Sequence, residues 1–482
     1  MKDDQITIEE ITRRIRSAFI GLTARSIVLR VVRSVTSYLI LPRLLPVETN
    51  GVFNIATAII TFFAFFSDVG LAASIIQKKE KVGEDDIKTA FTIQQMIVGT
   101  LSLGIVLSAP VFANFYHLGD EGSWLIRILG VSFFLTSLKS LPSVMLEREL
   151  NFTPLIKVEI LETIVSSALL ITLAMAGFGI WSFSVATLTS ALIGLMAIYI
   201  LAPIKLGLGI SKVAARNLLS YGIPYQTNNL LALVKDRLVP LVVAGMVGPQ
   251  GIGYVTWAQG MAYAPMEIMS AVNRITFPAF SRLQHDKKSL VRAIEKSLFV
   301  TTLMVYPALF GLVAILPYLI KYVVFLKWQP AIPSFYLFAF ASFWAVISTT
   351  FTNTLNAIGQ VKTTLKLMVF WTIITWILTP ALVLVFGFVG VAASAFIISF
   401  TSVLTIILVK RVLDVKLLDA LVLPIFASVV MAVAVHYFAQ LFVKNWVTTI
   451  LAIFLGAAVY FMVVYIFGRK KIMADLRKIR NA

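Results

Sequence analysis

The sequence predicts an all-α, polytopic membrane protein with about fourteen transmembrane helices, arranged as two six-helix lobes followed by two further helices. Three observations predict this fold. Of the 482 residues, 59% are hydrophobic and only 13% are charged, whereas a soluble domain carries roughly 25% charged residues. Apolar stretches of about 20 residues, enough to cross a bilayer, recur along the whole chain. Basic residues gather on every second connection between these stretches.

The apolar stretches predict spans that are separated by short polar connections. They lie near residues 20–42, 51–76, 89–113, 123–145, 155–176, 180–203, 218–246, 251–281, 290–317, 331–358, 364–386, 388–409, 418–440 and 446–468. We therefore expect a cytoplasmic arm (1–18), an N-lobe (19–204), a cytoplasmic linker (205–217), a C-lobe (218–411), two appended helices (412–468) and a basic cytoplasmic tail (469–482).

The distribution of basic residues predicts the orientation. On one set of alternate connections, including the termini, lie 29 of the 41 Lys and Arg residues, among them Lys139, whereas the other set holds only four. Since Lys and Arg collect on cytoplasmic loops, both termini are predicted to be cytoplasmic, in a protein of the cell inner membrane. These cytoplasmic basic residues account for the net charge of +18, so no nucleic-acid partner is predicted. Residues 1–17 lack the apolar core of a signal peptide, so we expect an uncleaved arm.

Short motifs recur in the two halves of the chain. The glycine that opens the second span, at 51–53, returns at 251–254, where the eighth span opens, and the hairpin at 177–178 returns at 387–388. Such repeats predict two related six-helix lobes with a shared cavity at their interface.

Arginines on the first span predict an anion-binding surface. Arg25, Arg30 and Arg33 fall within an arc of roughly 140° on a helix, and that span contains no acidic residue. A charge at bilayer depth costs a few kcal/mol or more, so it is expected to face a cavity or a partner. The planar guanidinium suits phosphate. Alternatively, Arg25 extends to the cytoplasmic surface as an interfacial residue.

Polar residues on other spans are predicted to line the same cavity. Candidate substrate-binding residues beyond the first span are Asn229, Lys235, Arg237 and Arg274. Candidate carriers of a coupling ion, H⁺ or Na⁺, are the intramembrane carboxylates Asp68, Asp236 and Glu267. No catalytic residue, metal site or other cofactor is predicted, because the chain has no Cys, three scattered His and no phosphate-cradling or triad motif.

Several motifs resemble those of a known family. They are the segments 40–46 (ILPRLLP), 66–71 (FSDVGL), 247–254 (VGPQGIGY), 274–281 (RITFPAFS), 356–360 (NAIGQ) and 386–392 (FGFVGVA). In order and spacing they are similar to bacterial polysaccharide flippases, the Wzx-type O-antigen and exopolysaccharide translocases of the multidrug/oligosaccharidyl-lipid/polysaccharide (MOP) superfamily.

The resemblance implies a MATE-like fold of two lobes around a cationic cavity. It implies translocation of an undecaprenyl-diphosphate-linked oligosaccharide by alternating access, next to a polysaccharide polymerase and glycosyltransferases. Among the candidate site residues, Asp68 and Arg274 match the motifs of the family best by position. We expect a monomer that binds membrane lipids and the lipid-linked oligosaccharide.

Three alternatives remain open. A lipid II flippase also needs a cationic cavity, whereas a drug antiporter needs a more acidic one, which Arg30, Arg33 and Arg274 disfavour. A polytopic polymerase or glycosyltransferase needs sizeable outer loops with catalytic residues. The predicted outer connections are short, and only the connection at 114–123 offers an acidic pair, Asp120 and Glu121.

Overall fold

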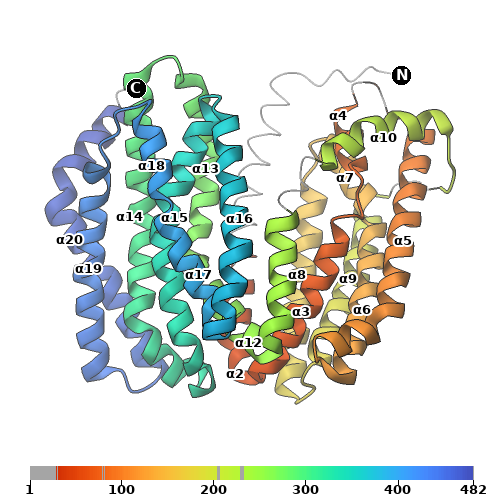
Figure 1. Cartoon of the computed structure of the whole chain (residues 1–482), viewed down its shortest axis with the longest axis horizontal. Coiled ribbons are helices and arrows are strands. Elements are labelled where there is room, and N and C mark those ends of the chain that lie inside the picture. Colours follow the sequence, from red (N-terminus) through yellow and green to blue (C-terminus); the bar gives the residue numbers. More distant parts are fainter. Residues whose placement is uncertain are drawn as a thin grey trace. The chain divides into compact units, whose positions relative to one another are not determined.

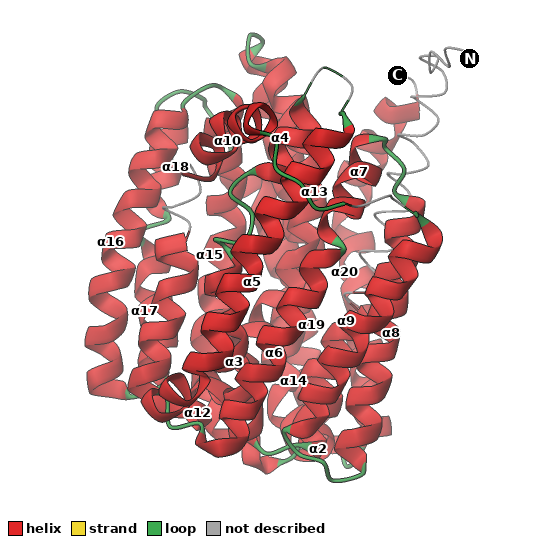
Figure 2. Cartoon of the chain, turned by 90° about the vertical axis from the view of Figure 1, so that its right-hand side faces the viewer, coloured by secondary structure: helices red, strands yellow, loops and turns green. Residues whose placement is uncertain are grey.

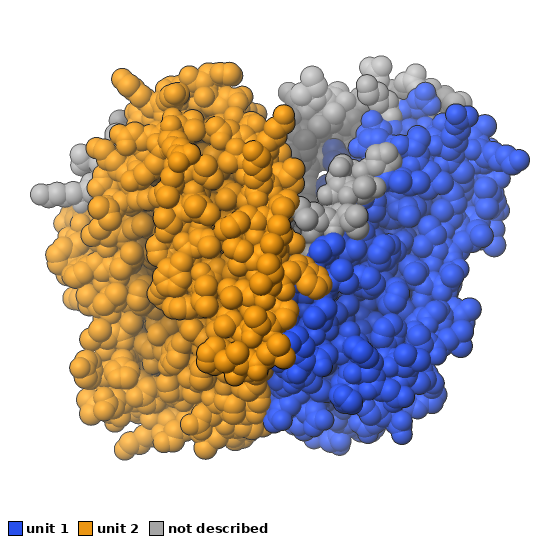
Figure 3. Space-filling model, viewed as in Figure 1, with its two compact units in different colours: residues 1–253 blue, residues 254–482 orange. Residues whose placement is uncertain are grey.

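The computed structural model describes residues 29, 31–78, 80, 82–203, 207–227 and 233–480. Every regular element in these ranges is a helix (Figure 2), which confirms the all-α prediction. Contacts group the chain into two compact units, unit 1 with residues 1–253 and unit 2 with residues 254–482 (Figure 3).

Unit 1 is a bundle of long helices joined by short ones (Figure 1). Its elements are η1 (Thr36–Ile40), α2 (Leu41–Leu44), α3 (Val47–Ala64), α4 (Leu71–Gln77), α5 (Glu84–Phe115), α6 (Gly119–Leu138), α7 (Ser140–Arg148), α8 (Thr153–Met175), α9 (Trp181–Leu201), α10 (Lys212–Thr227), η2 (Val234–Leu238) and the first part of α12 (Val239–Tyr263).

Unit 2 begins in the second half of α12, at residue 254, and is built from helices that pack around α14 and α15. Its elements are η3 (Ala264–Met266), α13 (Glu267–Leu283), α14 (Lys287–Leu319), η4 (Ile320–Val324), η5 (Leu326–Ala331), α15 (Ile332–Ala357), α16 (Val361–Phe386), α17 (Val389–Phe400), α18 (Val403–Lys410), α19 (Leu417–Phe442) and α20 (Trp446–Arg480). The two C-terminal helices belong to this unit, since α19 packs against α14 and α20 packs against α19.

Twelve helices of the described residues are long and apolar enough to cross a membrane, so the chain is a multi-pass membrane protein. They account for twelve of the fourteen predicted spans. The first part of the first predicted span, residues 20–28 and 30, lies outside the described residues. The seventh, at 218–246, is divided between α10, the undescribed residues 228–232, η2 and the start of α12. The α12 helix then bends at Gly248, whose φ of 68° and ψ of 179° suit glycine alone.

The division between the units lies further along the chain than the predicted linker at 205–217. The segment after that linker stays with unit 1 because α10 packs against α4 and α5. Two threonines of α5 hold the chain that leads into α10, since Thr92 Oγ1 accepts the Gly209 N–H at 2.9 Å and Thr89 Oγ1 accepts the Ser211 N–H at 2.9 Å.

Large apolar side chains on α5 are exposed in a single stripe. Met96, Leu103, Leu107 and Val111 are each at least 60% exposed. Their spacing of seven and four residues places them on one face of the helix. A stripe of this size would be costly in water, and hydrocarbon is the solvent that suits it.

The second predicted span is helical but interrupted. Its two parts, α3 and α4, are separated by residues 65–70, and Gly70 adopts a left-handed φ of 81°. The side-chain amide of Gln226 on α10 donates to the Phe65 carbonyl at 2.6 Å. A Cβ on Gly70 would overlap the backbone of Gly222, also on α10. The backbone of α10 therefore packs directly against the break. The Gln226 side chain satisfies a carbonyl that the interrupted helix leaves free.

The start of α3 and the middle of α12 cross at two glycines of unit 1. A Cβ on Gly51 would overlap the Pro249 carbonyl, and a Cβ on Gly253 would overlap the Val47 carbonyl. The same sequence offset separates Val47 from Pro249 and Gly51 from Gly253. Such a reciprocal contact is what two copies of one motif form about a two-fold axis, as expected if the halves are duplicated.

Replacing Gly51 with Ala is expected to destabilise the protein by about 1–3 kcal/mol, because the new methyl group overlaps a backbone carbonyl that cannot rotate away. Thermal unfolding of the purified protein in detergent measures the change. Gly104→Ala is the control: nothing lies within 4 Å of its Cβ position on α5, so that variant should be neutral or stabilised by about 0.5–1 kcal/mol. Equal unfolding temperatures for both variants would contradict the crossing.

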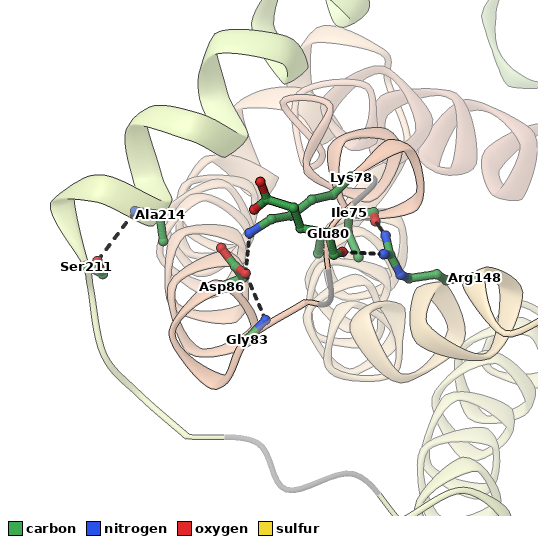
Figure 4. Close-up of polar contacts among 8 residues, drawn as sticks. All are labelled: Ile75, Lys78, Glu80, Gly83, Asp86, Arg148, Ser211 and Ala214. Carbon is green, nitrogen blue, oxygen red and sulfur yellow. Dashed lines mark hydrogen bonds and ion pairs between the residues drawn. The ribbon is translucent and has the colours of Figure 1, made fainter. Parts of the chain in front are cut away.

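Hydrogen bonds fasten the connection between α4 and α5 in unit 1 (Figure 4). Lys78 Nζ donates to the Asp86 carboxylate at 2.6 Å, and the Gly83 N–H donates to the same carboxylate at 2.9 Å. Arg148, at the end of α7, donates to the carbonyls of Ile75 and Glu80. The guanidinium thus satisfies a carbonyl left free at the C-terminus of α4.

Candidate functional site

The candidate site of unit 1 lies along α8, where charged side chains meet at membrane depth. Arg33 donates to Thr163 Oγ1 at 3.1 Å, and its guanidinium lies 3.7 Å from the Glu159 carboxylate. Thr163 is the eleventh of the 23 residues of α8, so at 1.5 Å per residue it lies about 15 Å from the start of the helix. Arg33 therefore contacts the middle of a membrane-spanning helix.

The Arg33 side chain is 60% exposed, and its ion pair with Glu159 is longer than a hydrogen bond. A guanidinium carries five N–H donors. Among the described residues, only Thr163 receives a hydrogen bond from it. The remaining donors, at a depth where a bare cation is costly, can bind an anion.

A second ion pair lies within one turn of the first. Lys139, at the junction of α6 and α7, donates to Glu162 on α8, and each side chain is only 18% exposed. Gly194 of α9 lies directly against Glu162, because a Cβ at that position would run into the carboxylate. The buried pair and the missing side chain together fix how α6, α8 and α9 meet.

The sequence-based prediction missed both partners on α8. Glu159 and Glu162 lie in the predicted span 155–176 at a spacing of three residues, which places two carboxylates on nearby faces of an apolar helix. That spacing was the available signal. Lys139, which the prediction counts with the cytoplasmic connections, lies within the helical stretch Gly119–Arg148 and is largely buried.

Asp68 lies in the interruption between α3 and α4. Its carboxylate accepts the Ala72 N–H at 3.2 Å and so caps the first turn of α4. The side chain is half-buried. Its position is therefore set by helix capping, and its role in ion coupling stays a prediction.

Glu267 lies at a 3-10 turn in unit 2. It is the first residue of α13, directly after the short helix η3, and it is half-buried. The chain stays helical through this turn, so the position of Glu267 differs from that of Asp68, and its role in ion coupling also stays a prediction.

The other predicted site residues are only partly described. Arg237, within η2, is exposed. The backbone of Lys235 and Asp236 belongs to η2 and that of Arg274 to α13, but their side chains lie outside the described part of the structure. Arg25, Arg30 and Asn229 lie outside the described residues altogether. Within the described ranges no three His, Asp or Glu side chains are placed to hold a metal ion.

Comparison with known proteins gives one family match and several relatives. The model of the family described as "Polysaccharide biosynthesis protein" matches residues 40–333. The succinoglycan biosynthesis transport protein ExoT of Rhizobium meliloti (strain 1021) is 25% identical over 87% of this chain and 86% of its own. The lipopolysaccharide biosynthesis protein WzxC of Escherichia coli (strain K12) is 25% identical over 72% of this chain and 70% of its own.

Solved structures share the fold. The lipid II flippase MurJ, in an inward closed conformation, superposes with a TM-score of 0.75 at 15% identity, over 94% of this chain and 100% of that chain. An inward-facing MATE multidrug transporter of the MOP superfamily gives a TM-score of 0.60 at 14% identity, over 82% and 98%. The predicted MATE-like fold and the resemblance to Wzx-type flippases are confirmed. The chain therefore belongs to the polysaccharide biosynthesis protein family and is a membrane transport protein of that family.

Proposed function

We propose that the protein is a flippase that carries an undecaprenyl-diphosphate-linked oligosaccharide across the cell inner membrane by alternating access, with both termini in the cytoplasm. The sugar is the repeat unit of an O-antigen, exopolysaccharide or capsule, since the relatives are named for succinoglycan and lipopolysaccharide biosynthesis.

The observation that carries this proposal is Arg33. Its guanidinium contacts the middle of α8, is 60% exposed, and lies 3.7 Å from its carboxylate partner. A diphosphate offers pairs of oxygens that the planar guanidinium fork can bind with two parallel hydrogen bonds. Its negative charge would offset the cost of holding this cation at mid-depth.

Transport is proposed to be coupled to H⁺ or Na⁺, with Asp68, Asp236 and Glu267 as candidate carriers of the ion. The protein is proposed to act as a monomer beside a polysaccharide polymerase and glycosyltransferases, which supply and consume the lipid-linked sugar.

Reconstitution tests the proposal directly. The purified chain in proteoliposomes should move a fluorescent undecaprenyl-diphosphate-linked oligosaccharide between leaflets, at a rate that responds to an imposed pH or Na⁺ gradient. A parallel experiment with lipid II separates the two substrates, because they share the diphosphate and differ in the attached sugar and peptide. Rates no higher than those of protein-free liposomes for the oligosaccharide, with or without a gradient, would contradict the proposal.

A further inference from the structure

The segment that leads into α10, residues 207–211, is fixed against the beginning of α5. The two hydrogen bonds from its backbone to the hydroxyl groups of Thr89 and Thr92 tie it there. Within the segment the exposed fraction alternates: Leu208 and Ile210 are 78% and 58% exposed, whereas the three residues beside and between them are half-buried. The bonds that hold the backbone inward therefore present two apolar side chains outward.

The depth of this segment in the membrane follows from α5. The exposed apolar side chains of α5 run from Met96 to Phe115, which is 66% exposed. At 1.5 Å per residue that part of the helix is about 28 Å long, close to the roughly 30 Å of a hydrocarbon core. Thr89 and Thr92 lie about 6–10 Å before Met96 on the same helix. The segment 207–211 therefore lies at the level of the lipid headgroups.

The α10 helix lies crosswise to α5, near the end of that helix (Figure 1, Figure 2). Its buried residues Ala214, Leu218 and Gly222 recur at every fourth position and face inward, where α10 packs against α4 and α5. On its outer side Val213 is 72% exposed. A helix that lies along the membrane surface with apolar and basic side chains outside its packed face is typical of interfacial helices.

Basic side chains accompany the exposed apolar ones. Lys212 and Arg216 lie about one turn apart on α10, and both are exposed. In the described part of the chain, neither forms an ion pair with a carboxylate. The sequence places no Asp or Glu between residues 163 and 235. This part of unit 1 therefore carries uncompensated positive charge beside exposed apolar side chains.

We propose that Leu208, Ile210, Lys212, Val213 and Arg216 form a binding surface for anionic phospholipid, here named the 208–216 surface. The apolar side chains enter the boundary between headgroups and acyl chains, and the two cations bind the lipid phosphates. In the predicted orientation this end of unit 1 meets the cytoplasmic leaflet, whose anionic lipids attract basic segments. A soluble protein partner would first have to displace those headgroups.

The 208–216 surface lies on other elements than the charged residues of α8, and it does not depend on which substrate is transported. Its failure in the tests below would leave the proposed function untouched.

The first test measures membrane insertion. Because the chain has no cysteine, Leu208→Cys and Ile210→Cys each carry a unique spin label in the full chain. In proteoliposomes of phosphatidylcholine and phosphatidylglycerol, both labels should be more accessible to oxygen than to a water-soluble nickel chelate. Lys287→Cys is the control, since this exposed residue begins α14 about 20 Å before Val300, the first exposed large apolar residue of that helix. Its label should show the reverse.

Labels at 208 and 210 that are as accessible to the nickel chelate as the label at 287 would overturn the inference. That result is expected if this face binds a soluble protein and not lipid.

The second test measures the choice of lipid. Titration of the full chain in detergent with fluorescent phosphatidylglycerol, and with the matching phosphatidylcholine, gives the ratio of the two affinities. The wild type should prefer phosphatidylglycerol. Lys212→Gln/Arg216→Gln should lower this preference by about fivefold for each residue removed, the factor that one basic residue contributes near an anionic surface. High salt should lower the wild-type preference in the same direction.

Lys287→Gln/Lys288→Gln is the matched control for the double variant. These two lysines are also exposed at the start of a helix, but they follow Asp286, and no large apolar residue between 278 and 299 is exposed. The control should keep the wild-type preference. Equal affinity of the wild type for both lipids, or an unchanged preference in Lys212→Gln/Arg216→Gln, overturns the inference. Unfolding temperatures that match the wild type establish that each variant is folded.

Discussion

Replacing Arg33 with Gln should reduce affinity for the diphosphate-linked substrate by at least about thirtyfold, because truncating an arginine anchor costs about 2 kcal/mol or more. Transport in proteoliposomes should fall accordingly. The variant should remain folded, since among the described residues it loses one hydrogen bond, to Thr163, and a long ion pair to Glu159, together worth about 1–2 kcal/mol. Arg33→Lys keeps the charge but loses the planar fork, so it should show an intermediate loss.

Arg127 provides the matched control for Arg33. Its guanidinium lies 4.7 Å from the ring centre of Trp124 on the same helix, α6, an arrangement that stabilises a cation locally without a ligand. Arg127→Gln should leave transport close to that of the wild type. Full transport by Arg33→Gln would remove this residue from the substrate site. Arg30→Gln, added to Arg33→Gln, tests whether the first span contributes a second guanidinium.

Replacing Lys139 with Met should destabilise the protein by about 3–5 kcal/mol, because it leaves the buried Glu162 carboxylate without its cation. The double variant Lys139→Met/Glu162→Gln removes both charges and should recover most of that loss. Chemical denaturation in detergent, followed across the two single variants and the double variant, measures the coupling energy of the pair.

A surface pair serves as the control for this cycle. Lys88 and Glu84, one turn apart at the start of α5, form an ion pair at 3.0 Å with side-chain exposures of 40% and 85%. Exposed pairs contribute about 1 kcal/mol or less, so Lys88→Met should change stability little. If Lys139→Met were no more damaging than Lys88→Met, the Lys139–Glu162 pair would not hold α6 against α8.

Most of the helical architecture could be predicted because each span carries its own signal. The chain around α5 shows why: an isolated apolar stretch must form a helix in lipid, since no water is there to bind its backbone groups. The predicted hairpins at 177–178 and 387–388 are also present in the structure, where Gly177 and Gly387 adopt positive φ values of 84° and 58°. Only glycine adopts these turns readily, so the residue type itself marks them.

Interruptions within spans were harder to predict. The span at 51–76 is mostly apolar, with a few polar residues such as Asp68, and its hydrophobic periodicity does not show the break at 65–70. That break exists because α10, more than a hundred residues later, supplies Gln226 and Gly222 to close it. Similarly, Asp68 was predicted as an intramembrane carboxylate, but its use as a cap for Ala72 depends on where α4 begins.

By itself, the sequence determined that the chain is a helical membrane protein and which family it resembles, and its basic loops predict an orientation. These properties follow from local hydrophobicity, local charge and short motifs. Tertiary structure alone decided that Arg33 meets Glu159 and Thr163, and that Lys139 meets Glu162. Arg33 and Thr163 are 130 positions apart. A charged residue in the sequence of one helix indicates that it needs a partner. Which residue becomes that partner depends on how the helices pack.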